Sequence, residues 1–184
     1  MEQLPEVLAS EPAFAGRIFD VRSDTIRFAD GREQRLDIVA HAGSFAILAC
    51  PAPDRFVLVR QYRHPARAWL WELPAGKAEA GEVPLEGAAR ELAEETGYRA
   101  ARLREIAAFY MTPGFCDELL HLVLAEGLTS GERHLDPDEE IEVRVVGLDE
   151  ARAMAARGEI LDAKTLLALL WLAGERTQLL PRRG

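Results

Sequence analysis

The stretch that decides the fold is GKAEAGEVPLEGAARELAEETGY, which runs from Gly76 to Tyr98. Three of its glutamates, Glu91, Glu94 and Glu95, have a spacing that places them on one face of a helix. Acids this close repel one another unless a cation neutralises them. Carboxylate oxygens are the ligands that hard divalent cations such as Mg²⁺ prefer. The cluster therefore predicts a divalent-metal site on a helix.

The same stretch predicts a loop followed by a helix over residues 82–96. Pro84 suits the first helical position, because its missing N–H would have no partner there. Gly97 suits the left-handed conformation that ends many helices. An apolar stripe is expected to face the core, and it consists of Leu85, Ala88, Ala89 and Leu92.

The fixed positions of this stretch resemble the signature of the Nudix hydrolases, G-x5-E-x7-R-E-U-x-E-E-x-G-U, in which U is aliphatic. Tyr98 departs from the aliphatic final position. An acidic surface helix would explain the charges as ordinary ion pairs, but it would not explain the spaced glycines and Glu82. The resemblance implies an α/β protein with the Nudix α/β/α sandwich and a mixed sheet. The matching residues are Gly76, Glu82, Arg90, Glu91, Leu92, Glu94, Glu95 and Gly97.

Composition excludes several other classes of protein. The chain of 184 residues is long enough for one domain with an arm, and its 48% hydrophobic and 29% charged residues are ordinary for a globular protein. A formal charge of −9 argues against a nucleic-acid surface, which would be basic. No apolar run reaches the roughly 18 residues that span a bilayer, so no membrane partner is expected. Two distant cysteines and an N-terminus without a signal-peptide pattern favour the reducing cytoplasm.

The order of expected elements fits a mixed sheet with helices on its faces. Residues 16–40 predict an antiparallel hairpin, and we expect residues 1–40 to form a β arm that mediates dimerisation. The Nudix domain is expected over residues 41–176, followed by a tail at 177–184. Strands are expected at 44–50, 55–62, 69–73, 101–110, 119–126 and 140–148. Further helices are expected at 149–157, capped by Asp149 and Gly158, and at 162–174.

Features outside the signature resemble the ADP-ribose pyrophosphatase branch of the family. The run Arg60-Gln61-Tyr62-Arg63 precedes Glu72-Leu73-Pro74-Ala75-Gly76, and Pro113 lies 15 residues after Tyr98. The N-terminal hairpin is similar to the arm through which that branch forms a domain-swapped homodimer. The resemblance implies hydrolysis of the diphosphate of ADP-ribose to AMP and ribose 5-phosphate. Two alternatives remain: a pyrophosphatase for another sugar nucleotide such as GDP-mannose, and a non-catalytic ADP-ribose sensor, which the complete set of acids disfavours.

The resemblance also assigns site residues. Strand alternation places Arg60 and Arg63 on opposite faces of the strand, and we prefer Arg63 for the substrate. Glu139 is expected to be the general base, with Asp138 and Glu140 as neighbouring alternatives in the same acidic loop. Phe14 and Phe19 are candidates for stacking on the nucleobase. Glu91, Glu95 and an orienting Arg90 would join the base as catalytic residues. Substrate is expected at Arg63, Glu72, Gly76, Pro113 and Glu118, and Mg²⁺ or Mn²⁺ at Glu82, Glu91, Glu94, Glu95 and the carbonyl of Ala75.

Overall fold

The computed structural model describes residues 3–79, 81–135 and 140–174. These residues divide into two compact units. The first unit contains Met1–Gly43 and Phe109–Leu119, and the second contains Ser44–Ala108 and Leu120–Gly184.

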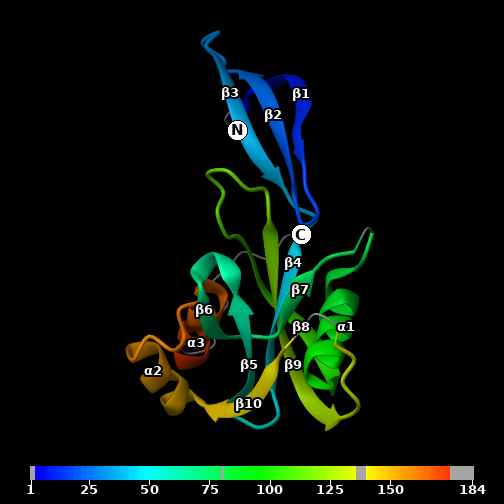
Figure 1. Ribbon diagram of the computed structural model, residues 1–184, viewed down its shortest axis with the longest axis vertical. Coiled ribbons are helices and arrows are strands. Elements are labelled where there is room, and N and C mark those ends of the chain that lie inside the picture. The colour runs from blue at the N-terminus through cyan, green and yellow to red at the C-terminus, as the bar shows by residue number, and fades with distance from the viewer. Residues whose placement is uncertain (1–2, 80, 136–139, 175–184) are drawn as a thin grey trace. The chain divides into compact units, whose positions relative to one another are not determined.

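The first unit is built on a three-stranded antiparallel sheet of order β1-β2-β3 (Figure 1). The expected hairpin is confirmed as β2 (Asp20–Arg27) and β3 (Glu33–Ala40). The additional edge strand β1 (Glu6–Ala15) was not expected. Pro12 in β1 lies at a register shift of the β1–β2 pair. Proline cannot donate to the ladder, so it is tolerated where the ladder is interrupted.

The segment Phe109–Leu119 belongs to the same unit as this arm. The backbone N–H of Val39 donates to the carbonyl of Phe115 at 2.8 Å. The carboxylate of Asp117 accepts a hydrogen bond from Arg22 at 2.7 Å and another from the backbone N–H of His41 at 2.7 Å. The segment is therefore tied to two strands of the arm.

The second unit contains two sheets, of order β10-β5-β6 and β7-β4-β9-β8. Strand β4 pairs in parallel with β9 and antiparallel with β7, so the sheet is mixed, as predicted. Figure 1 shows α1 on one side of the strands and α2 with α3 on the other. The strands are β4 (Ser44–Cys50), β5 (Arg55–Arg63), β6 (Ala68–Glu72), β7 (Ala75–Lys77), β8 (Tyr98–Tyr110), β9 (Leu119–Ser130) and β10 (Glu142–Gly147). The helices are α1 (Pro84–Thr96), α2 (Leu148–Ala156) and α3 (Ala163–Ala173).

The core of the second unit forms around β4, in which every residue from Ser44 to Ala49 is buried. A strand covered on both faces reads as a continuous apolar run, which explains why its bounds could be predicted. Helix α1 covers β4, because Ala88 and Leu92 pack in one cluster with Phe45 and Ile47. Leu85 was expected in this buried stripe, but it is 37% exposed. The ring of Phe45 packs at Gly87 instead, where an added Cβ would lie 2.1 Å from it, so the buried face is centred away from Leu85.

The helix ends follow local chemistry. Pro84 opens α1 and Gly97 closes it with φ 74°, as predicted. The prediction that Asp149 caps α2 was wrong, since Gly147 is the N-cap; Asp149 lies in the first turn, where its charge still favours the helix dipole. Asp162 caps α3 by accepting a hydrogen bond from the N–H of Thr165 at 3.0 Å. Among the helices of the described ranges, none is long and apolar enough to cross a membrane.

Candidate active site

Arg90 lies at the centre of the acidic face of α1. Its Nε and Nη2 donate to the two carboxylate oxygens of Glu82, each at 3.0 Å, which forms a bidentate pair. Its Nη1 donates to Glu91 at 2.9 Å and to Glu94 at 3.0 Å. The hydrogen bond from Arg90, supported by the N–H of Glu79, lowers the pKa of Glu82. One guanidinium therefore gathers three of the predicted acids.

The backbone of β7 lies against this helix face. The Ala75 N–H donates to Glu95 at 3.0 Å, and Glu95 is only 4% exposed. At Gly76 an added Cβ would lie 1.9 Å from the carboxyl carbon of Glu91. Only a residue without a side chain allows that approach. Ala75 therefore lies beside Glu95, and Gly76 lies beside Glu91.

The donor chemistry at this place fits a divalent cation, since the groups are glutamate carboxylates beside a backbone carbonyl. As the side chains stand, no group of three or more His, Cys, Asp or Glu among the described residues converges closely enough to hold a metal ion. Arg90 pairs with Glu82, Glu91 and Glu94 and supplies their counter-charge. The assignment of metal ligands therefore stays a prediction.

Arg63 and Glu72, both predicted to contact substrate, pair with each other. Arg63 donates from Nε and Nη2 to the two oxygens of Glu72, each at 2.9 Å. Burial raises the pKa of Glu72, but the hydrogen bond from Arg63 and the charge of Lys164 outweigh it, so the pKa lies below the ordinary value. The pKa of Arg63 is raised by Glu72 first, and the charge of Glu95 contributes as well. Arg63 is thereby electrostatically coupled to Glu95 of α1.

Sequence reasoning missed Lys164, which completes this pair from α3. Its Nζ donates to Glu72 at 2.7 Å and to Asp162 at 2.8 Å. Lys164 is 92 residues away from Glu72 in the chain. The one available signal was a lysine inside the apolar run AKTLLALLWLA, because a lysine that becomes buried needs an anionic partner.

Pro113 and Glu118, both predicted to contact substrate, belong to the first unit. The candidates for the general base come after β9 in the chain. Pro113 lines a cavity of about 290 Å³ together with Arg22, Tyr110 and Phe115. Asp138 and Glu139 lie outside the described residues, and Glu140, the remaining alternative for the base, is exposed. In the arm, Phe14 and Phe19 are both exposed, with ring centroids 6.3 Å apart. Their predicted roles are not tested by these positions.

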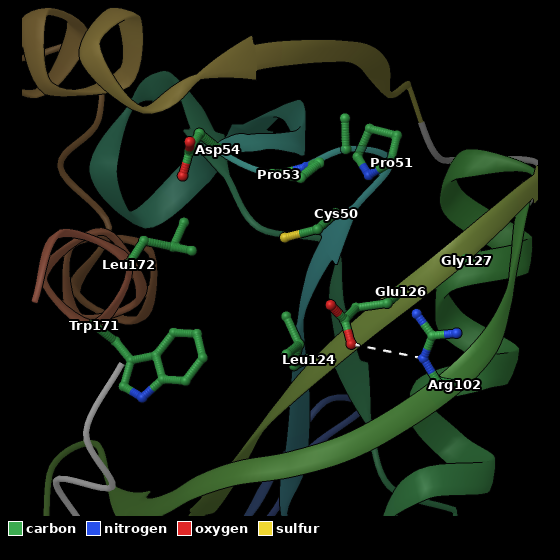
Figure 2. A pocket seen from close by; sticks show the side chains of 11 residues that line it. Cys50, Pro51, Pro53, Asp54, Arg102, Leu124, Glu126, Gly127, Trp171 and Leu172 are labelled. Atoms are coloured by element: carbon green, nitrogen blue, oxygen red, sulfur yellow. Dashed lines mark ion pairs between the residues drawn. The ribbon is translucent and has the colours of Figure 1, made fainter. Parts of the chain in front are cut away.

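A second cavity, of about 240 Å³, lies at the end of β4 (Figure 2). Figure 2 shows Trp171 and Leu172 of α3 on one side and the ion pair of Arg102 with Glu126, 3.9 Å long, on the other. Cys50 points between them. The lining comes from the β4–β5 turn, β8, β9 and α3, so this cavity is separate from the acidic face of α1.

Comparison with known proteins identifies the class. The sequence pattern of the NUDIX domain matches residues 40–169. The chain is 41% identical over 175 residues to the ADP-ribose pyrophosphatase of Bacillus subtilis (strain 168), covering 94% of this chain and 95% of that protein. It is 37% identical over 169 residues to the methanol dehydrogenase activator of Bacillus methanolicus, covering 91% of each. A crystal structure of an ADP compounds hydrolase shares the fold, with a TM-score of 0.80, 24% identity and 94% coverage of both chains. This protein therefore belongs to the Nudix family, and the predicted α/β fold is confirmed.

Proposed function

We propose that this protein is a Nudix hydrolase that cleaves the diphosphate of ADP-ribose to AMP and ribose 5-phosphate. The observation that carries the proposal is the gathering of Glu82, Glu91 and Glu94 around one guanidinium, with the backbone of β7 in contact. Such a cluster suits metal-assisted hydrolysis of a phosphoanhydride. The substrate is supported by the similarity to the Bacillus subtilis ADP-ribose pyrophosphatase, which extends through the arm as well as the domain.

The cofactor in this proposal is Mg²⁺ or Mn²⁺, held by Glu91, Glu94 and Glu95, with the Ala75 carbonyl as a further ligand and Glu82 acting through water. Such an ion neutralises diphosphate charge and lowers the pKa of the attacking water. Arg90 would keep the acids oriented when they are not bound to metal.

The rest of the reaction is assigned to the other predicted residues. In hydrolysis the water oxygen forms a bond to one phosphorus, the bridging P–O bond breaks, and the released proton passes to a base. Glu139 is proposed as that base. Arg63 would attract the diphosphate, and Pro113 and Glu118 would contact the remainder of the substrate.

The proposed assembly is a homodimer formed through the arm. Several apolar side chains of the arm are exposed, including Leu4 at 85%, Val7 at 59% and Ile18 at 63%. Contiguous exposed apolar groups mark interaction surfaces. A second copy of the chain is the proposed partner, with Phe14 or Phe19 stacking on the nucleobase. The reducing cytoplasm remains the proposed compartment, on the cysteine usage alone.

The test is AMP release from ADP-ribose, GDP-mannose, NADH and diadenosine polyphosphates, each with Mg²⁺, with Mn²⁺ and with EDTA. We expect the highest kcat/KM for ADP-ribose and no turnover in EDTA. Glu95→Gln keeps an oxygen for the Ala75 N–H but loses the charge, so kcat should fall by about 100-fold or more with the fold intact. A higher kcat/KM for GDP-mannose than for ADP-ribose would identify GDP-mannose as the preferred substrate instead. Binding of ADP-ribose without hydrolysis would make the protein a sensor.

A further inference from the structure

A chain of ionic contacts runs from the N-terminus of α3 to Arg63 at the end of β5. Asp162 accepts from Lys164 at 2.8 Å, Lys164 donates to Glu72 at 2.7 Å, and Glu72 accepts two hydrogen bonds from Arg63 at 2.9 Å. The side chains of Glu72 and Lys164 are 2% and 9% exposed, whereas that of Arg63 is 41% exposed. The guanidinium is therefore the point at which this buried chain of charges reaches the surface.

The charges of these four side chains sum to zero, because two cations face two carboxylates. Oε2 of Glu72 accepts from both Lys164 and Arg63, so its negative charge is shared between them. Removing Lys164 would leave one positive and two negative charges in a poorly solvated place. Arg63 would then have to compensate Glu72 alone, and the net negative charge would repel an anionic ligand.

We propose that Lys164 is a positioning residue for substrate binding, acting through Glu72 to hold Arg63 in place and to keep its charge available to the diphosphate. The inference rests on the proposed function, because it concerns the binding of ADP-ribose. Lys164 itself is buried and does not contact substrate. Its removal should therefore raise KM and leave kcat nearly unchanged.

A structural role for this part of α3 is separable from the electrostatic one. The hydroxyl of Thr165 accepts from the backbone N–H of Leu73 at 2.9 Å and donates to Asp162 at 2.5 Å. Thr165 thus ties α3 to the end of β6 without contributing charge. Thr165→Val removes this tie at nearly constant volume, so it provides a matched control for a loss of packing or anchoring.

The experiment compares KM and kcat for ADP-ribose in the full-length wild type, Lys164→Met, Lys164→Met/Asp162→Asn and Thr165→Val. Lys164→Met should raise KM about tenfold, the size expected for one unit charge near a partly buried anion site, and change kcat less than about threefold. Adding Asp162→Asn removes the surplus negative charge while asparagine still caps the helix, so KM should return to within about threefold of wild type. Thr165→Val should lower the melting temperature and leave KM unchanged.

Several results would overturn the proposal. One is a folded Lys164→Met with the KM of the wild type, and another is a double variant whose KM stays raised. Asp162→Asn alone gives an independent check if Lys164→Met does not fold, because a surplus positive charge should lower KM by about threefold; an unchanged or higher KM would count against the role. A wild type that does not hydrolyse ADP-ribose would overturn the proposed function as well, whereas wild-type hydrolysis with unshifted KM values removes only the role of Lys164.

Discussion

Gly76 and Glu91 lie 15 residues apart in the sequence, yet their backbone and carboxyl group are in contact. The requirement for glycine here is steric, because an added Cβ would lie within 2.2 Å of all three atoms of the carboxyl group. An added Cβ would therefore displace the carboxylate of Glu91, which Arg90 also bonds at 2.9 Å. The glycine therefore defines where the carboxylate is held.

Gly76→Ala should displace the carboxylate of Glu91 and lower kcat/KM for the preferred substrate by about 100-fold, with a stability loss of about 1–3 kcal/mol from overpacking. Steady-state kinetics and urea unfolding measure the two effects. Gly147→Ala is the control, because an added Cβ there would meet only the carbonyl of Asp54 at 3.9 Å. Equal activity in the two variants would show that the approach of Gly76 to Glu91 does not matter for catalysis.

The signature predicted which residues form the candidate site, but not which of them are in contact. Spacing along a helix predicted that Glu91, Glu94 and Glu95 share a face, since that geometry is local. The contact of Gly76 with Glu91, and that of Glu72 with Lys164, depend on how separate elements pack. No pattern in one sequence carries that information.

Among the elements, α1 owes its end to Gly97. This residue has φ 74°, and an added Cβ would lie 2.8 Å from the carbonyl oxygen of Gly131. Gly97→Ala therefore combines backbone strain with a clash, and it should destabilise the protein by about 2–4 kcal/mol. Gly158→Ala separates the two causes, because Gly158 has φ 76° but an added Cβ has nothing within 4 Å. Its cost should be about 1 kcal/mol. Equal losses in denaturant unfolding would mean that the clash at Gly131 relaxes freely.

The ion pairs of Glu72 with Arg63 and Lys164 make the stability of the protein depend on pH. The pKa of Glu72 is lower in the folded protein than its ordinary value, so the unfolded chain binds the additional proton first as the pH falls. The pair therefore stabilises fully above about pH 4.3, the ordinary glutamate pKa, and progressively less below it. Glu72→Gln should cost about 3–5 kcal/mol near neutral pH, because it leaves buried cations unpaired, and the difference from wild type should narrow below about pH 4.

Urea unfolding at several pH values measures this dependence. Glu159→Gln is the control, since the ion pair of Glu159 with Arg157 lies at the surface, where such pairs contribute little. A difference between wild type and Glu72→Gln that stays constant down to acid pH would contradict the assignment of the lowered pKa to Glu72.

Element prediction succeeded where one local signal dominated. The bounds of β4 were predicted correctly because Ser44–Cys50 is a buried apolar run between turn residues. Strand β1 was missed because Pro12 and two register shifts break its alternation, and it gains its structure by pairing with β2. The short strand β7 was expected to be a loop, since only its pairing with β4 defines it.

At the scale of the whole molecule, the division of the chain was harder to foresee than its fold class. The strand and helix order predicted a mixed sheet with helices on its faces, and the resemblance to the Nudix hydrolases implied an α/β/α sandwich with an N-terminal β arm; the structure bears out this fold class. The assignment of Phe109–Leu119 to the unit of the arm depends on backbone pairing with Val39 and on the ion pair of Arg22 with Asp117, which link segments distant in sequence.

The exposed apolar side chains of the arm lead to the prediction about assembly. Val7 is 59% exposed on β1, a strand whose residues are almost all exposed. If the arm packs on a second copy of the chain, the wild type should have twice the chain mass of 20.4 kDa in light scattering after gel filtration. A charge at position 7 would then be buried without a partner, so Val7→Asp should give monomers. AMP release should fall at least about tenfold if the two copies share the site.

Leu170→Asp is the matched control, because Leu170 is 67% exposed on α3, in the other unit of the chain. It introduces the same charge at a similarly exposed leucine and should leave both mass and activity unchanged. A monomeric wild type would remove the dimer itself. A Val7→Asp monomer with full activity would keep the dimer but show that each chain carries a complete site, which would also exclude Phe14 and Phe19 from stacking on a nucleobase bound by the other copy.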